Sequence, residues 1–175
     1  MFFRTLIAAS LLAAPALAAN AKACDASCKV ETLLTHNVGI ALDKKVSIAD
    51  IKKLGKVKGD NLEKRASAYY PGKFDIVHHV MFDGLTVNAT VTPDHNVLVE
   101  RIKLTGGTFS LPFGLKLGPI KGLHDIDFVL GQPTETHRTG NAMDWVYSNL
   151  EQTESVTFHR TDKAILSVIW EYGGD

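Results

Sequence analysis

Three strand-like runs joined by tight-turn signals place the strongest constraint on how this chain can fold. The runs span Phe74–Phe82, Leu85–Thr92 and Val97–Leu104, and they are rich in β-branched and aromatic residues or alternate apolar with charged ones. Asp83-Gly84, between the first two runs, is a strong signal for a two-residue hairpin, and Pro93–Asn96 predicts the next turn. We therefore expect a three-stranded antiparallel meander.

Two helices are expected before this meander. Apolar residues recur at helical spacing over Lys29–Leu42, which predicts a helix with one buried stripe. Ser47-Ile48-Ala49-Asp50 fits a capping box, and the helix that follows it would end at Gly55, a natural C-terminal glycine. The polar, basic stretch Lys56–Arg65 is interpreted as a connector.

The order of a helix followed by strands returns in the second half. Residues 106–121 are rich in Gly and Pro and are interpreted as a linker. A short helix is expected over Leu123–Leu130, and strands are expected over Met143–Asn149, Ser155–Arg160 and Ala164–Tyr172.

This recurrence predicts an internal repeat. One constant shift along the chain brings Leu54 onto Leu130, Gly55 onto Gly131, Tyr69 onto Trp145 and Phe82 onto Phe158. The alternative is a chance agreement of a few apolar positions. We predict an α+β fold of two tandem helix-plus-antiparallel-meander repeats, over residues 19–105 and 122–175, joined by the linker 106–121.

The first 18 residues have the pattern of an export signal. Arg4 supplies a positive start, Leu6–Leu17 is an apolar run of signal-peptide length, and Ala16-Leu17-Ala18 fits a signal-peptidase site. The predicted location is therefore periplasmic or secreted. A retained N-terminal anchor is one alternative, and lipid attachment at Cys24 is another, although Lys22 stands where such a site needs a small neutral residue.

Cys24 and Cys28 are the only two cysteines of the chain. An even number of cysteines in an exported protein favours a disulfide. The closed loop is small, so the bond would pin the N-terminal segment and contribute little to the stability of the whole domain. A redox pair and a metal-binding pair are the alternatives.

Residues 122–133, Gly-Leu-His-Asp-Ile-Asp-Phe-Val-Leu-Gly-Gln-Pro, are followed by Trp145-Val146-Tyr147 and by two further strand-like runs. This pattern resembles the superfamily that joins beta-lactamase inhibitor protein to the small lipoprotein of the outer-membrane β-barrel assembly machine. Two tandem copies look more like the inhibitor. The resemblance implies a module that binds another protein with a sheet face, and it implies no chemistry.

Charge and motifs exclude several other classes of function. Lys and Arg number 19 and Asp and Glu also number 19, so no excess of positive charge favours nucleic acid. His78 and His79 are neighbours on an expected strand and point to opposite faces, so they cannot both bind one metal ion. No Gly-x-Ser-x-Gly elbow is present. We expect no enzyme, no cofactor and no stable membrane insertion of the mature chain.

Aromatic and histidine side chains are the best candidates for partner contacts, because aromatic residues are over-represented at binding hot spots. The candidates are Tyr69, His79, Trp145, Tyr147 and His159. A role in the core is the alternative for the aromatic ones. We place the two histidines on an open sheet face, where protonation would weaken binding as the pH falls.

The expected function is an exported protein-binding module, in its most specific form an inhibitor or immunity protein that covers a partner enzyme with an open sheet face. The second hypothesis is an envelope assembly or structural factor, as in the lipoprotein branch of the superfamily. The third is a carrier of a metal ion or small ligand.

Overall fold

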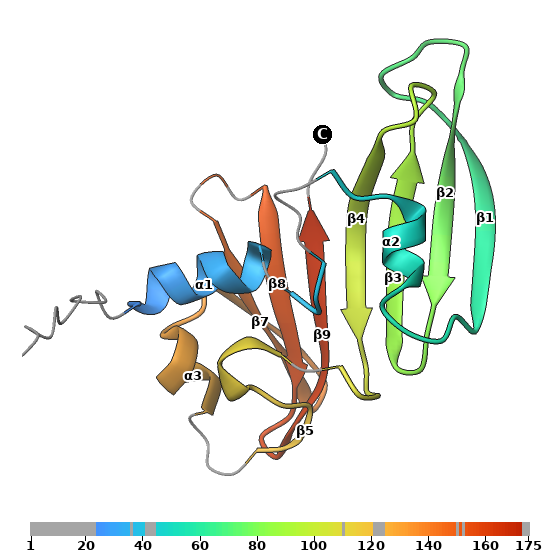
Figure 1. Cartoon of the computed structure of the whole chain (residues 1–175). Helices are drawn as coiled ribbons and strands as arrows, with labels where there is room; N and C mark the ends of the chain where they lie inside the picture. The colour runs from blue at the N-terminus through green and yellow to red at the C-terminus, as the bar shows by residue number, and fades with distance from the viewer. Residues whose placement is uncertain are drawn as a thin grey trace, which may run out of the picture.

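The computed structural model describes residues 24–35, 37–40, 45–109, 111–120, 125–149, 151 and 153–172. Within these residues, nine strands form one antiparallel sheet in the order β1-β2-β3-β4-β9-β8-β7-β6, and the short β5 pairs with β9 (Figure 1). The strands are β1 (Gly59–Ala66), β2 (Phe74–Met81), β3 (Leu85–Val91), β4 (Val97–Leu104), β5 (Gly118–Pro119), β6 (Glu135–Thr139), β7 (Ala142–Ser148), β8 (Glu154–Arg160) and β9 (Ala164–Tyr172). The helices are α1 (Ala26–Thr35), α2 (Ile48–Lys52), α3 (Asp125–Leu130) and the 3-10 turn η1 (Pro112–Gly114).

The predicted α+β fold of two helix-plus-meander repeats is wrong. β4 of the first half pairs with β9 of the second, from Arg101 opposite Glu171 to Leu104 opposite Val168, so both halves share one sheet. The three α-helices in the described part of the chain span only 10, 5 and 6 residues, and the fold is mainly β. Two separate meanders would each leave backbone hydrogen-bonding groups unpaired at an edge, and joining β4 to β9 satisfies them.

Most of the individual elements follow the sequence pattern. The six strands β2, β3, β4, β7, β8 and β9 lie where strands were predicted. The capping box at α2 is confirmed, because the Ser47 hydroxyl accepts a hydrogen bond from the Asp50 backbone N–H (3.2 Å) and donates one to the Asp50 carboxylate (2.6 Å). α1 ends at Thr35, earlier than predicted.

Three strands, β1, β6 and the short β5, were not predicted, and the interpretation of residues 56–65 as a connector is wrong for most of its length. β1 and β6 are the edge strands of the sheet, and most of their residues are exposed. An exposed strand has no apolar face, so it carries no alternation of apolar and polar residues. The segment interpreted as a linker also contains structure, since η1 and β5 lie within it.

Of the two N-terminal predictions, the disulfide falls within the described residues and the export signal does not. Residues 1–18, the predicted export signal, lie outside the described residues. The disulfide is confirmed: Cys24 is bonded to Cys28 in the first turn of α1, with the two Cα atoms 5.3 Å apart. Of the helices in the described ranges, none is long and apolar enough to span a bilayer.

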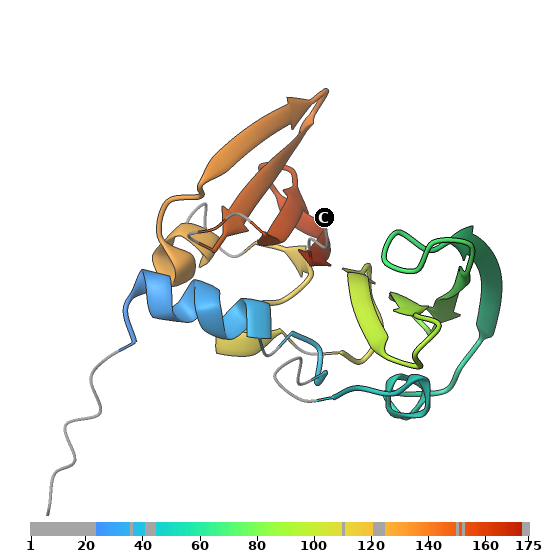
Figure 2. The ribbon, with the colours of Figure 1, turned by 90° about the horizontal axis from the view of Figure 1, so that it is seen from above.

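All three α-helices pack on the same face of the sheet. Figure 2 shows α1 and α2 on this face, seen from above. One in-register row of fully buried side chains crosses six strands on this face: Val80, Val87, Ile102, Trp170, Val156 and Tyr147. Because side chains alternate between faces along a strand, the row beside it belongs to the opposite face. That second row is polar throughout: His79, Asn88, Arg101, Glu171, Ser155 and Ser148. We call the face that carries it the open face.

Hydrogen bonds and an ion pair hold α1 and α2 against the sheet. The Trp170 indole N–H donates to the carbonyl of Leu33 in α1 (2.9 Å), and the Tyr172 hydroxyl donates to the carbonyl of Leu34 (3.0 Å). At α2, Lys52 binds the Asp60 carboxylate (2.7 Å), which also contacts a ring nitrogen of His78 (3.1 Å). Burial raises the pKa of Asp60, but the hydrogen bonds from Lys52 and His78 outweigh it and lower the pKa.

The buried tyrosines predict that the protein loses stability in alkali. Burial raises the pKa of Tyr147 and of Tyr172 above the ordinary value of 10.0. The folded chain therefore keeps protons that the unfolded chain releases, so this stabilisation is complete below about pH 10 and is lost as the pH rises further. Urea unfolding between pH 8 and 11 measures the effect. Tyr147→Phe should flatten the decline, and an equally steep decline would contradict this account.

Candidate functional site

The open face carries a hollow of about 810 Å³, which we call the open-face hollow. Its lining comes from β1 to β4, from the loop of residues 67–73, from β8 and β9, and from Val46 ahead of α2. Four of the lining residues also pack against the core: Val46, Val97, Val99 and Tyr172. The hollow therefore lies across the junction of the two halves of the sheet. Pairing of β4 with β9 creates this surface, and neither half contains it alone.

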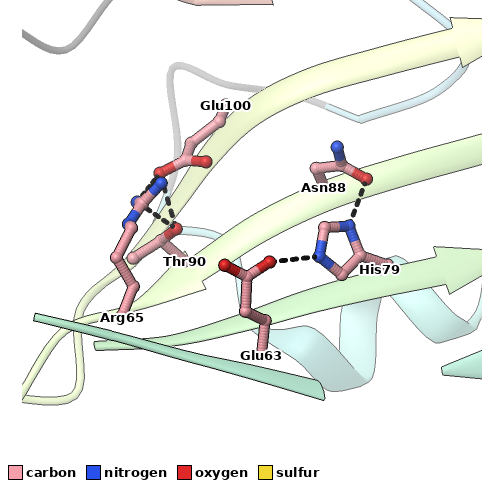
Figure 3. Close-up of polar contacts among 6 residues, drawn as sticks. All are labelled: Glu63, Arg65, His79, Asn88, Thr90 and Glu100. Atoms are coloured by element: carbon pink, nitrogen blue, oxygen red, sulfur yellow. Dashed lines mark hydrogen bonds and ion pairs between the residues drawn. The ribbon is translucent and has the colours of Figure 1, made fainter. Parts of the chain in front are cut away.

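An arginine network of three side chains lines the open-face hollow. Figure 3 shows the contacts within it. The guanidinium of Arg65 on β1 pairs with the carboxylate of Glu100 on β4, and it donates to the hydroxyl of Thr90 on β3 (3.1 Å). Thr90 in turn donates to Glu100 (2.6 Å). The hydrogen bond with Glu100 raises the pKa of Arg65, so its positive charge is permanent. The network therefore links β1, β3 and β4.

A histidine bridge lies next to this network. The two ring nitrogens of His79 on β2 contact the side-chain oxygen of Asn88 on β3 (3.1 Å) and the carboxylate of Glu63 on β1 (3.4 Å). His79 is about one-third exposed and stands beside the hollow without lining it. It links three strands on the open face.

The charged groups that line the hollow have a net negative charge. They are Asp75, Glu100, Glu154 and Glu171 on the acidic side and Arg65 and Arg101 on the basic side. Each arginine forms an ion pair with a glutamate, Arg65 with Glu100 and Arg101 with Glu171 (3.3 Å). Asp75 and Glu154 supply the excess negative charge. A ligand of positive charge complements this surface.

Tyr69 is the predicted contact residue that lines the hollow. It lies in the loop between β1 and β2, and 56% of its side chain is exposed. Leu98 of β4 lines the hollow as well and is 44% exposed. An exposed aromatic ring and an exposed aliphatic side chain beside charged groups are typical of a protein-contact surface.

Two of the predicted contact residues lie on the helix-covered face. Tyr147 is 1% exposed and donates its hydroxyl hydrogen bond to the carbonyl of Gly131 (3.1 Å), so it belongs to the core, and its assignment as a surface contact is wrong. Trp145 is half-buried, and the buried guanidinium of Arg160 stacks on its ring at 4.1 Å. The alternation of β7 places both side chains on one face, and that face is covered by α1 and α3.

His159 lies on the open face but far from His79. A ring nitrogen of His159 contacts the Asp144 carboxylate (2.5 Å) on the neighbouring strand β7. Three strands, β3, β4 and β9, separate the strands of the two histidines, so the fold does not bring them together. Within the described residues, no group of three His, Cys, Asp or Glu side chains is arranged to hold a metal ion.

Comparisons with known proteins leave the function open. No family model matches the chain, and no curated protein matches it. The crystal structure of a DUF4309 family protein (YjgB) from Bacillus subtilis is similar over 74% of this chain and 80% of that chain, with 15% sequence identity and a TM-score of 0.38. A likeness of this size carries no information about activity, so the function has to be argued from the open face itself.

Proposed function

We propose that this chain is an exported protein-binding module that docks a partner protein on the open face of its sheet, as an inhibitor or immunity protein covers an enzyme. The observation that carries the proposal is the open face, with its polar row, its hollow and the exposed Tyr69 and Leu98 that line this hollow. The Cys24–Cys28 disulfide is typical of proteins in oxidising compartments, which supports export. The resemblance to the beta-lactamase inhibitor superfamily stays a prediction.

The charge of the hollow indicates the kind of partner. Its lining is acidic in excess, so a partner that presents basic side chains would be steered to this face and would avoid like-charge contacts there. Interfaces of this kind combine a few buried anchors with a polar rim. We therefore expect a partner with a basic, protruding segment.

The test starts with capture of the partner and ends with a charge reversal. The purified protein is immobilised, proteins retained from the envelope and secreted fractions of the producing organism are identified by mass spectrometry, and the affinity of the retained partner is measured by calorimetry. Glu171→Lys should weaken binding at least tenfold, because it reverses a charge in the hollow. The matched control is Glu31→Lys on the exposed side of α1, which should change the affinity less than twofold.

The outcomes separate the hypotheses. A retained hydrolase or toxin whose activity is lost on binding supports the inhibitor class. Retained assembly proteins of the outer membrane would move the function to the envelope-factor class. Equal affinities for Glu171→Lys and Glu31→Lys would show that the partner binds elsewhere, and the open-face proposal would then be wrong.

A further inference from the structure

Asp75 is the most unusual group in the open-face hollow. Its side chain is 4% exposed, yet it lines the hollow. Its Oδ1 atom is shielded from water and has no hydrogen-bond partner among the described residues. A buried carboxyl oxygen without a donor destabilises the fold, because the group loses its hydration and gains nothing in return. A donor brought by a ligand would remove this deficit.

The neighbour best placed to satisfy Asp75 is engaged elsewhere. Arg65 lies directly opposite Asp75 in the pairing of β1 with β2. Its guanidinium nevertheless pairs with Glu100 and donates to Thr90, with Asp75 acting on it only through charge. The Oδ1 atom of Asp75 therefore lacks a donor at the lining of an acidic hollow, because the nearby cation, Arg65, is paired with Glu100.

We propose that Asp75 is the anchor point for an arginine side chain of the partner protein. This inference rests on the proposed function and adds the chemistry of the contact. A guanidinium carries five N–H donors in a planar fork, which suits a carboxyl group better than the compact ammonium of lysine. The entering side chain would pass Arg65 and Tyr69, which are both about half exposed at the hollow.

The direct test uses a small probe and needs no partner. The isotope-labelled full chain is titrated with Nα-acetyl-arginine methylamide and with the citrulline analogue, which has the same shape and no charge, and NMR shifts are followed. The arginine probe should bind at least tenfold more tightly, with shifts confined to β2 and the loop of residues 67–73. Equal binding of the two probes, or shifts that map to another surface, would overturn the inference.

Two variants localise the effect. Asp75→Asn should reduce the affinity of the arginine probe to that of citrulline. Glu31→Gln removes the same charge from an exposed side chain of α1, outside the hollow, and should change the affinity no more than about twofold, because exposed charges are screened by water and salt. An unchanged affinity in Asp75→Asn would contradict the proposal, and the comparison of the two probes on the unmodified chain decides it if this variant does not fold.

The stability of Asp75→Asn towards urea distinguishes a binding role of Asp75 from a purely structural one. If Asp75 serves as a binding group with an unsatisfied oxygen, Asp75→Asn should leave the urea midpoint unchanged or raise it, because the charged oxygen is removed from a buried position. If Asp75 has only a structural role, the same change should lower the midpoint and leave probe binding intact.

Failure of this inference and failure of the proposed function are distinguishable. A partner captured through the hollow without any binding of the arginine probe would leave the protein-binding module standing and remove the Asp75 anchor. Specific binding of the probe at Asp75 without any protein partner would keep the anchor site and remove the inhibitor function.

Discussion

Trp170→Ala should lower the free energy of unfolding by about 3–5 kcal/mol, the range found when large buried side chains are truncated to alanine. The side chain is fully buried. It stands on β9 between Ile102 of β4 and Val156 of β8, so its removal leaves a cavity at the junction of the two halves. The change also leaves the Leu33 carbonyl without the indole donor that ties α1 to the sheet.

Urea unfolding followed by circular dichroism measures this effect. Trp170→Phe keeps most of the ring and loses the hydrogen bond, so a smaller loss of about 1–3 kcal/mol is expected. Leu166→Ala is the control on the same strand: Leu166 is 45% exposed, and the change should cost less than about 1 kcal/mol. If Trp170→Ala costs no more than this control, packing at the β4–β9 junction does not make the large contribution to the free energy of unfolding that is expected.

Local patterns predicted the half-buried parts of this fold. Strands β2, β3 and β4 were readable because tight turns separate them and because one face of each is buried. The short helix α2 was readable from its cap at Ser47. These signals depend only on residues close together in the sequence.

The joining of the two halves had no local signal. Pairing of Arg101 with Glu171 and of Ile102 with Trp170 connects residues far apart in the chain. The proposed equivalence of Tyr69 with Trp145 does not hold either, since Tyr69 lies in a loop and Trp145 lies in strand β7.

The candidate site was predictable only in part, for the same reason. Tyr69 was selected as an aromatic contact candidate, with a role in the core as the alternative, but Arg65, Asp75 and Glu100 were not selected at all. They come from three strands, and only the register of the sheet puts them around one hollow. The sole local hint was Asp75, a charged residue inside an apolar strand-like run.

Gly107→Ala is the second substitution with a large expected effect. Gly107 has φ +82°, and an added Cβ would lie 2.1 Å from the backbone oxygen of Asp83 in the β2–β3 hairpin. The same contact region holds the hydrogen bonds that Thr105 and Gly106 donate from their N–H groups to the carbonyl of Gly84 (2.7 and 3.2 Å). The left-handed backbone costs about 1–2 kcal/mol for a residue with a side chain, and forced displacement of packed backbone costs about 1–3 kcal/mol more.

Substitutions at Gly106 and Gly72 separate the cost of the left-handed backbone from the cost of the steric clash. Gly106→Ala meets nothing within 4 Å and needs no positive φ, so the free energy of unfolding should stay within about 0.5 kcal/mol of the original. Gly72→Ala has open space but φ +77°, so it should cost only the backbone contribution of about 1–2 kcal/mol. Gly107→Ala should exceed both, at about 3 kcal/mol or more, in the same urea experiment. A loss at Gly107 no greater than that at Gly72 would mean that the hairpin moves aside freely, and the segment after β4 would then not be held against the β2–β3 turn.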